Sequence, residues 1–182
     1  MNKLWMISVI SLVVGAAAIT GCETAPKSDE GKASLSIDTD AALSRAKIAD
    51  PSLHDFLANA YGYAVFPTVG KGGVGIGGAY GRGEVFEKGV KIGYCDLSQA
   101  TIGLQLGGQS YTEIIAFENK AALDNFKYGK LKFAAQATAV ALRSGAGANA
   151  KYTDGVSVFT TGEAGLMAEA AIGGQSFSFQ PL

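Results

Sequence analysis

The chain is poor in the residues that most often build catalytic and metal sites: its 182 residues include one histidine, His54, and two cysteines, Cys22 and Cys95. His54 has no cysteine or second histidine near it in the sequence, which argues against a zinc site and a histidine-based catalytic triad. Cys95 lies among apolar residues and is expected to be buried as a small hydrophobic side chain rather than to react. We therefore expect no metal, no cofactor and no enzymatic activity.

A strong excess of either charge is also absent, because 15 basic residues face 16 acidic ones and the formal net charge is −1. Proteins that bind nucleic acid are usually basic, so nucleic acid is not an expected partner. Acid–base catalysis would need converging carboxylates. Glu113, Glu163 and Glu169 could face solvent or a cavity, and solvated strand faces explain them most simply.

Glycine, in contrast, is abundant, with 25 residues. The segment 70–78 contains the pattern G-x-G-x-x-G at Gly73, Gly75 and Gly78. A phosphate-binding loop needs the N-terminus of a helix directly after these glycines. Residues 79–84 form helices poorly, so nucleotide binding is not expected.

Residues 1–22 have the layout of a secretory signal: Lys3 supplies a positive charge, an apolar segment follows, and small residues lead to Cys22. The residues Ile19-Thr20-Gly21-Cys22 resemble the lipobox of bacterial lipoproteins. This resemblance implies that residues 1–21 are a cleaved signal peptide and that Cys22 carries fatty acyl chains such as palmitate. An uncleaved membrane helix is the alternative, but no positively charged stop-transfer cluster follows the apolar segment.

The lipobox resemblance makes the membrane the expected partner. Two acyl chains anchor a protein stably, and residues 22–34 are expected to be a polar tether between them and the domain. In lipoproteins of this kind, Glu23 in place of aspartate favours the outer membrane of a Gram-negative cell. The expected location is therefore the outer membrane, facing the periplasm, with the inner membrane and the cell surface left open.

Residues 35–182 suffice for one domain with its own core but not for two. The pattern predicts one helix from Ala41 to Ala49, capped by residues 38–40, and a second from Pro51 to Ala60, capped by Asp50. A third is expected over residues 120–128, between Asn119 as its cap and Gly129.

From Tyr61 onward the pattern changes to the alternation and glycine content of strands. The expected strands are residues 63–67, 74–77, 84–86, 100–106, 111–117, 130–142, 156–160 and 163–179, with a bend near Gly81 or Gly83. Residues 106–111 and 172–177 resemble each other, which suggests a sheet that bends at equivalent places. We predict an α+β fold with a curved, largely antiparallel, partly barrel-like β-sheet and two or three short flanking helices.

Several ordered blocks resemble the SYLF domain family, and the resemblance extends over most of the chain from about Ala41. The blocks are Tyr61 to Pro67, Gly70 to Gly73, Gly77 to Val85, Leu104 to Ser110, Glu113 to Phe117, Ala122 to Phe126 and Gly129 to Lys132. Resemblance to this family implies lipid binding: eukaryotic members bind phosphoinositide membranes and some act on actin, whereas bacterial members are often lipoproteins of unknown role. The chain lacks the basic amphipathic helix that precedes the domain in eukaryotic members, so actin is not an expected partner.

On this interpretation, residues 35–182 form a non-catalytic domain that binds lipid or an anionic membrane surface. The candidate contacts are the basic residues Lys71, Arg82, Lys130 and Lys132, in addition to the anchor at Cys22. Each basic residue near an anionic surface contributes about 1 kcal/mol. The alternative is a periplasmic carrier that holds a small apolar or amphiphilic ligand in a cavity of the curved sheet.

Overall fold

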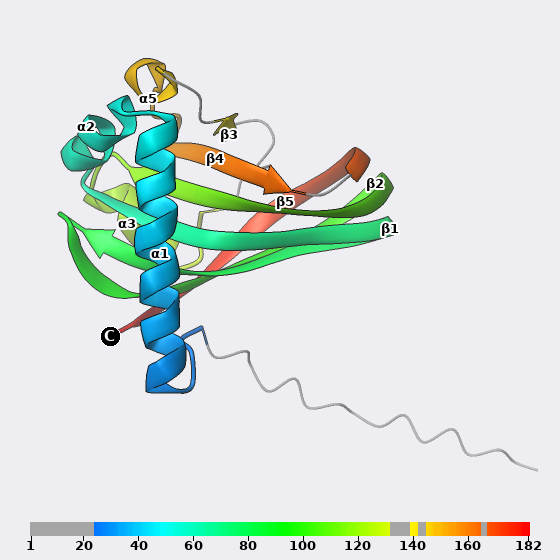
Figure 1. Ribbon diagram of the computed structural model, residues 1–182, viewed down its shortest axis with the longest axis horizontal. Coiled ribbons are helices and arrows are strands. Elements are labelled where there is room, and N and C mark those ends of the chain that lie inside the picture. The colour runs from blue at the N-terminus through cyan, green and yellow to red at the C-terminus, as the bar shows by residue number, and fades with distance from the viewer. Residues whose placement is uncertain (1–23, 132–138, 142–144, 165–166) are drawn as a thin grey trace, which may run out of the picture.

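The computed structural model describes residues 24–131, 139–141, 145–164 and 167–182 (Figure 1). Five strands and four helices lie in these ranges, in the order α1 (Asp29–Ala49), α2 (Ser52–Asn59), β1 (Gly62–Glu87), β2 (Val90–Phe117), α3 (Lys120–Lys127), β3 (Ala139–Ala141), α5 (Ala146–Asn149), β4 (Val156–Ala164) and β5 (Met167–Pro181). Every strand pair except β3–β4 is antiparallel. The predicted α+β fold with a largely antiparallel sheet is therefore confirmed.

One long hairpin forms the frame of the sheet. β1 and β2 pair from Gly62, opposite Phe117, to a turn at Lys88 and Gly89. Both turn residues have positive φ, 50° and 78°, as type I′ hairpin turns require. β5 pairs with the half of β2 near this turn, β4 pairs with the half near α3, and β3 pairs with β4. No ladder between described residues joins β5 to β3 or β4, so the described sheet is open and the barrel-like part of the prediction is not supported.

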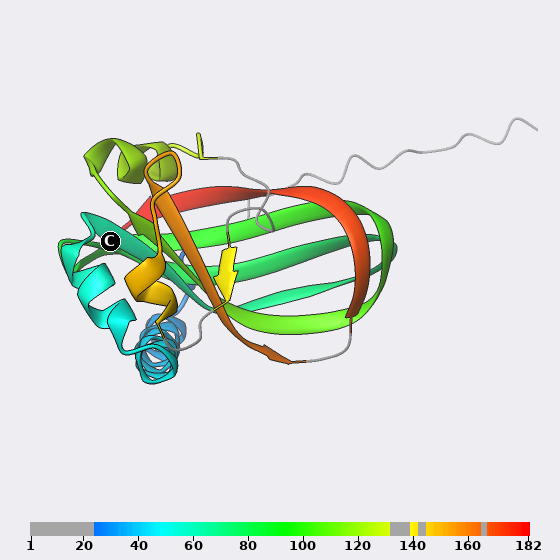
Figure 2. The same cartoon turned by 90° about the horizontal axis from the view of Figure 1, so that it is seen from above.

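The hairpin is bent in its middle, so that the early and late halves of β1 lie side by side (Figure 2). A Cβ atom on Gly83 would lie 2.2 Å from the carbonyl oxygen of Val65. The chain therefore reverses between these positions, where the pairing with β2 is irregular at Val74 and Ile76. The bend predicted near Gly81 or Gly83 is displaced: Gly83 instead allows close approach of the two halves, because it has no side chain.

The inner face of the curved sheet carries an aromatic core that α3 covers. The ring of Phe126 on α3 lies 5.0 Å from Phe117 on β2 and 5.1 Å from Phe177 on β5, between ring centroids. Phe66 and Leu97 complete this inner core. α3 begins at the predicted cap, because the Asn119 side chain accepts a hydrogen bond from the Ala122 amide at 3.0 Å, so this predicted helix is confirmed.

α1 and α2 cover the outer face of the early half of β1, of the second half of β2 that pairs with it, and of β4. Leu43, Leu53 and Leu57 of these helices pack on a sheet surface that includes Ile114 and Phe159. Because side chains alternate along a strand, these sheet residues point away from the inner core.

Asp50, between α1 and α2, is buried and joins the two helices to the segment that begins α5. Its carboxylate accepts hydrogen bonds from the hydroxyl and the amide of Ser52 and from the amides of Gly145 and Gly147. Burial raises the pKa of Asp50, but these hydrogen bonds outweigh burial and hold the pKa below its usual value. α2 begins at Ser52 with Pro51 as its N-cap and no side-chain cap hydrogen bond, so Asp50, the predicted cap, binds the Ser52 amide from the position before the cap.

α1 is longer than predicted. It begins at Asp29 rather than Ala41, and Ser28 caps it by accepting a hydrogen bond from the Gly31 amide at 3.1 Å. Residues 38–40 therefore lie inside the helix and do not cap it. Residues 29–34, which we placed in the polar tether, are helical. Most of the strand predicted over residues 130–142 lies outside the described residues, and 139–141 form β3.

Candidate functional site

The structure describes three of the five predicted site residues. Cys22 and Lys132 lie outside the described residues. Lys71 and Arg82 are in the early and late halves of β1, and Lys130 follows α3.

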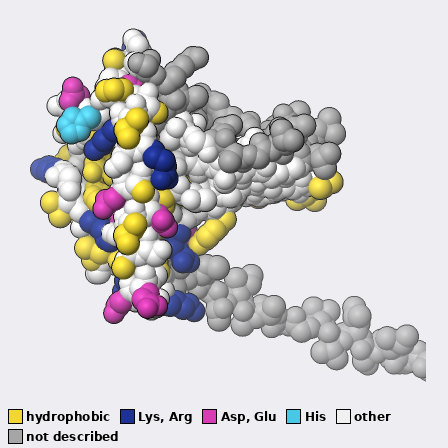
Figure 3. Space-filling model, viewed as in Figure 1, with side chains coloured by type: hydrophobic (Ala, Val, Ile, Leu, Met, Phe, Trp, Pro, Cys, Tyr) yellow, Lys and Arg dark blue, Asp and Glu magenta, His cyan; other side chains and the backbone are white. Residues whose placement is uncertain are grey.

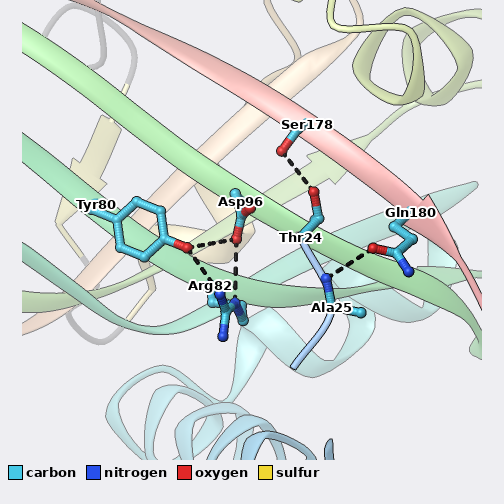
Figure 4. Close-up of polar contacts among 7 residues, drawn as sticks. All are labelled: Thr24, Ala25, Tyr80, Arg82, Asp96, Ser178 and Gln180. Atoms are coloured by element: carbon cyan, nitrogen blue, oxygen red, sulfur yellow. Dashed lines mark hydrogen bonds and ion pairs between the residues drawn. The ribbon is translucent and has the colours of Figure 1, made fainter. Parts of the chain in front are cut away.

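Arg82 takes part in a polar cluster on the outer face, where the late half of β1 pairs with the first half of β2 (Figure 4). It lies directly opposite Asp96 in the ladder, and its Nε is 3.5 Å from Asp96 Oδ1. The hydroxyl of Tyr80 donates to the same Oδ1 at 3.0 Å and accepts from Arg82 Nη2 at 3.3 Å. Burial raises the pKa of Asp96, although Tyr80 and Arg82 both act to lower it.

The first described residues of the chain bind beside this cluster. We call Thr24, Ala25 and Pro26 the strap, and all three are buried. Thr24 Oγ1 lies 3.1 Å from the hydroxyl oxygen of Ser178, and the amide of Ala25 donates to Gln180 Oε1 at 3.1 Å. Figure 4 shows these contacts next to Asp96 and Arg82. The strap therefore places Arg82 close to a point in the chain that is two residues from Cys22.

The three described candidate residues, Lys71, Arg82 and Lys130, do not form one patch. Ser178 is opposite Asp96 in the ladder, so it shares the outer face with the Arg82 cluster. Phe177 points to the inner face, where Phe126 of α3 packs on it. Lys130 follows α3 and thus belongs to the other side of the sheet from Arg82. Lys71 lies opposite Gln109 on β2, near the bend.

Beyond α1, the described side chains on the outer face of the late half of β1, and of the parts of β2 and β5 that pair with it, are exposed, and we call this surface the open face. At residues 79–80, 98–100 and 174–177, exposed members of this face alternate with buried residues of the inner face. Its exposed members are Ile76, Tyr80, Ser98, Ala100, Gly174 and Ser176. Ile76 is 73% exposed and Val74, at the bend, is 77% exposed. We call the part of the hairpin that leads to the bend the arm. In Figure 3 its described part is mostly white, with hydrophobic side chains at its far end.

A buried polar pair lies on the inner face at the border of the apolar core. Glu113 and Gln175 are each 1% exposed, and Gln175 Nε2 donates to Glu113 Oε2 at 2.9 Å. Burial raises the pKa of Glu113 to about 7, although the hydrogen bond from Gln175 lowers it. The expectation that Glu113 lies on a solvated strand face is therefore wrong. The side chains of Glu163 and Glu169 lie outside what the structure describes.

Cys95 is buried in the inner core, as predicted, and burial raises the pKa of its thiol well above the usual value. His54 is exposed on α2. The described residues contain no group of three or more histidine, cysteine and acidic side chains that could hold a metal ion. None of the described helices combines the length and the apolar character needed to cross a bilayer.

Comparison with known proteins places one relative beside this chain. It is 31% identical over 149 residues to Beta cell expansion factor A of Aeromonas veronii, an alignment that covers 81% of this chain and 57% of the relative. The chain thus spans little more than half of the relative's length. No family model matches the chain.

The sequence did not reveal the strap, Tyr80 or Asp96 as parts of a site. Thr24 and Ala25 are separated from Ser178 and Gln180 by 154 and 155 positions, so no local pattern connects them. The pairing of Arg82 with Asp96 depends on the hairpin register. A tight turn at Lys88-Gly89 was the signal that could have revealed this register.

Proposed function

We propose that this chain is a non-catalytic envelope lipoprotein whose SYLF-like domain binds lipid at the membrane that holds Cys22. The observation that carries the proposal is the position of the strap. Its contacts with Ser178 and Gln180 hold the chain on the sheet immediately after the proposed anchor, beside Arg82. A domain attached in this way lies against the bilayer surface rather than at the end of a long tether. The proposed location is the outer membrane, on the periplasmic side.

Anionic lipid is the proposed preference, with a smaller electrostatic contribution than four clustered cations would make. Arg82 is paired with Asp96, and its side chain is 37% exposed. Lys130 is on the other side of the sheet, so the three described candidate residues cannot all meet one flat bilayer. We therefore expect apolar contact to contribute as much as charge.

The alternative is a carrier of a small amphiphilic ligand, and the Glu113–Gln175 pair favours it. Both side chains leave an oxygen without a hydrogen-bond partner among the described residues, which a ligand with a donor group could satisfy. Three hollows lined by described residues, with volumes of about 210, 270 and 340 Å³, do not include this pair. We carry membrane binding further because the strap holds the chain on the outer face directly after Cys22.

Lipid labelling and vesicle flotation test the proposal. Cells fed a clickable fatty acid should label the wild type and not the Cys22→Ala variant. The Cys22→Ala chain should still float with phosphatidylglycerol vesicles, more than with phosphatidylcholine vesicles, and 1 M salt should reduce only this difference because it shortens the screening length to about 3 Å. Labelling that persists in Cys22→Ala would refute the lipid anchor at Cys22. The absence of flotation with both kinds of vesicle would refute lipid binding by the domain.

A further inference from the structure

We propose that the open face is the surface with which the domain contacts the bilayer, with Tyr80 and Ile76 touching the lipid and Val74 at the inserted end. This inference rests on the proposed function, because it uses the lipid anchor at Cys22. It adds the orientation of the domain and the residues that meet the membrane.

The position of the strap fixes which side of the domain is near the bilayer. Consecutive Cα atoms are 3.8 Å apart, so the Cα of Cys22 lies within about 8 Å of the Cα of Thr24. Thr24 itself is held on the outer face through Ser178. A cysteine whose acyl chains are in the bilayer therefore brings the membrane to the part of the outer face beside the N-terminal end of α1. The inner face with α3 is turned away, and α2 follows the other end of α1, about 30 Å along that helix.

The outer face continues along β1 from the strap to the bend. Arg82, in the cluster beside the strap, and Ile76 are six residues apart on β1, which corresponds to about 20 Å. Tyr80 lies between them on the same face. α1 rises from this face next to the strap, where Leu35 packs with Ala25 and Tyr94. The contact is therefore made by the part of the face beyond α1, from Tyr80 to the bend.

The exposed side chains along this line suit a membrane interface. Ile76 and Val74 are aliphatic and mostly exposed, at 73% and 77%. Tyr80 is 46% exposed, and its hydroxyl is hydrogen-bonded to Asp96, so its ring can face lipid while its polar group stays paired. Asp96 is the acidic residue at the near end of this line, and it is 6% exposed and paired with Arg82. No exposed member of the open face is charged. The exposed acidic residues beside the strap, Asp29 and Glu30, lie in the first turn of α1, where Lys32 is 3.8 Å from Asp29.

The experiment uses the lipidated full chain in vesicles of phosphatidylglycerol and phosphatidylcholine, with single cysteines that carry an environment-sensitive fluorophore. Ser98→Cys and Ser176→Cys place the probe on the open face, and Ala58→Cys places it on an exposed position of α2 as the control. The buried native Cys95 should not compete for the reagent. Doxyl-labelled lipid should quench the probes at positions 98 and 176 at least twofold, and the probe at position 58 hardly at all.

The outcomes separate the two proposals. Vesicles that float with the protein but quench no probe on the open face, or that quench position 58 equally, would overturn the orientation and leave the proposed function intact. Probes at 98 and 176 that are shielded from iodide without vesicles, together with a doubled mass in light scattering, would show that a second copy of the chain covers the face and would also overturn it. A lipidated chain that does not float would refute both.

Discussion

The bent hairpin has one end that helices cover and another that forms the arm, and the two are built from different residues. The helix-covered end holds large buried side chains, among them Phe66, Phe117 and Phe159, packed between α3 on one face and α1 and α2 on the other. The arm that leads to the bend has glycine, serine, alanine and Tyr80 on its outer face, with Val74 and Ile76 exposed. This difference teaches that stability is concentrated at one end, and that the exposed apolar residues of the other end are available for contact with a partner.

The largest effect should come from the helix-covered end. Phe159→Ala removes a fully buried ring that lies 5.1 Å from Phe56 of α2, so the free energy of unfolding should fall by about 3–5 kcal/mol. Ile76→Ala in the arm should change it by no more than about 0.5 kcal/mol. Urea unfolding of both variants checks this contrast, and equal losses would show that the arm stabilises the fold as much as the core does.

The border between the two ends should respond to pH through Glu113. Its carboxyl ionises near 4.5 when unfolded and near 7 when folded, so ionisation favours unfolding and stability is lost as pH rises between these values. Glu113→Gln should remove this loss, which amounts to about 3 kcal/mol when complete at pH 8. Urea unfolding at pH 4 and pH 8 measures the difference from wild type. The exposed carboxylate variant Glu118→Gln is the control, and an identical pH response in Glu113→Gln and wild type would contradict the assignment.

Two glycines distinguish close packing at one end from open space at the other. A Cβ on Gly83 would lie 2.2 Å from the Val65 carbonyl oxygen, whereas a Cβ on Gly70 would meet nothing within 4 Å. Gly83→Ala should lower the free energy of unfolding by about 1–3 kcal/mol, and Gly70→Ala should leave it within about 0.5 kcal/mol of wild type. Thermal melts of the pair measure this, and the reverse order would show that the halves of β1 do not approach at Gly83.

The strap should depend on a few hydrogen bonds and give the smallest global effect. Gln180→Ala removes the acceptor for the Ala25 amide, which should cost about 1 kcal/mol and speed hydrogen exchange at residues 24–26. Asn149→Ala removes a hydrogen bond to Gly145 at the helix-covered end and should leave exchange in the strap unchanged. Mass spectrometry of the exchanging peptides distinguishes them, and unchanged strap exchange in Gln180→Ala would mean that this contact does not hold the strap.

The sequence predicted the elements whose signals are local. Asn119 and Gly129 mark the ends of α3, and the helix pattern of residues 51–60 corresponds to α2. The early part of α1 was missed because its polar sequence has almost no apolar repeat, and Leu35 and Thr39 are its buried residues before Ala42. For the same reason, Asp38 and Asp40 were predicted to cap a helix that begins at Ala41, although they lie inside α1.

The long strands and the candidate site depend on contacts that no local pattern contains. Glycines interrupt the alternation of β1 and β2, so each strand was predicted as several short ones, although the backbone ladder is nearly continuous. The pairing of Arg82 with Asp96 follows from the register of that ladder. The burial of Glu113 follows from its place between β1 and β4 and from its contact with Gln175 of β5, which is distant in sequence.

The central claim is that the arm binds membrane without stabilising the fold, and one pair of variants tests it most directly. In the Cys22→Ala chain, Ile76→Asp and Ile48→Asp each charge an isoleucine that is more than two-thirds exposed, at 73% on the arm and 81% on α1. Flotation with phosphatidylglycerol vesicles should fall about tenfold or more for Ile76→Asp, because a buried isoleucine contributes about 1.5–3 kcal/mol. It should not change for Ile48→Asp, and both melting temperatures should match that of the parent. Equal flotation of the two variants, or a larger loss for Ile48→Asp, would contradict the claim.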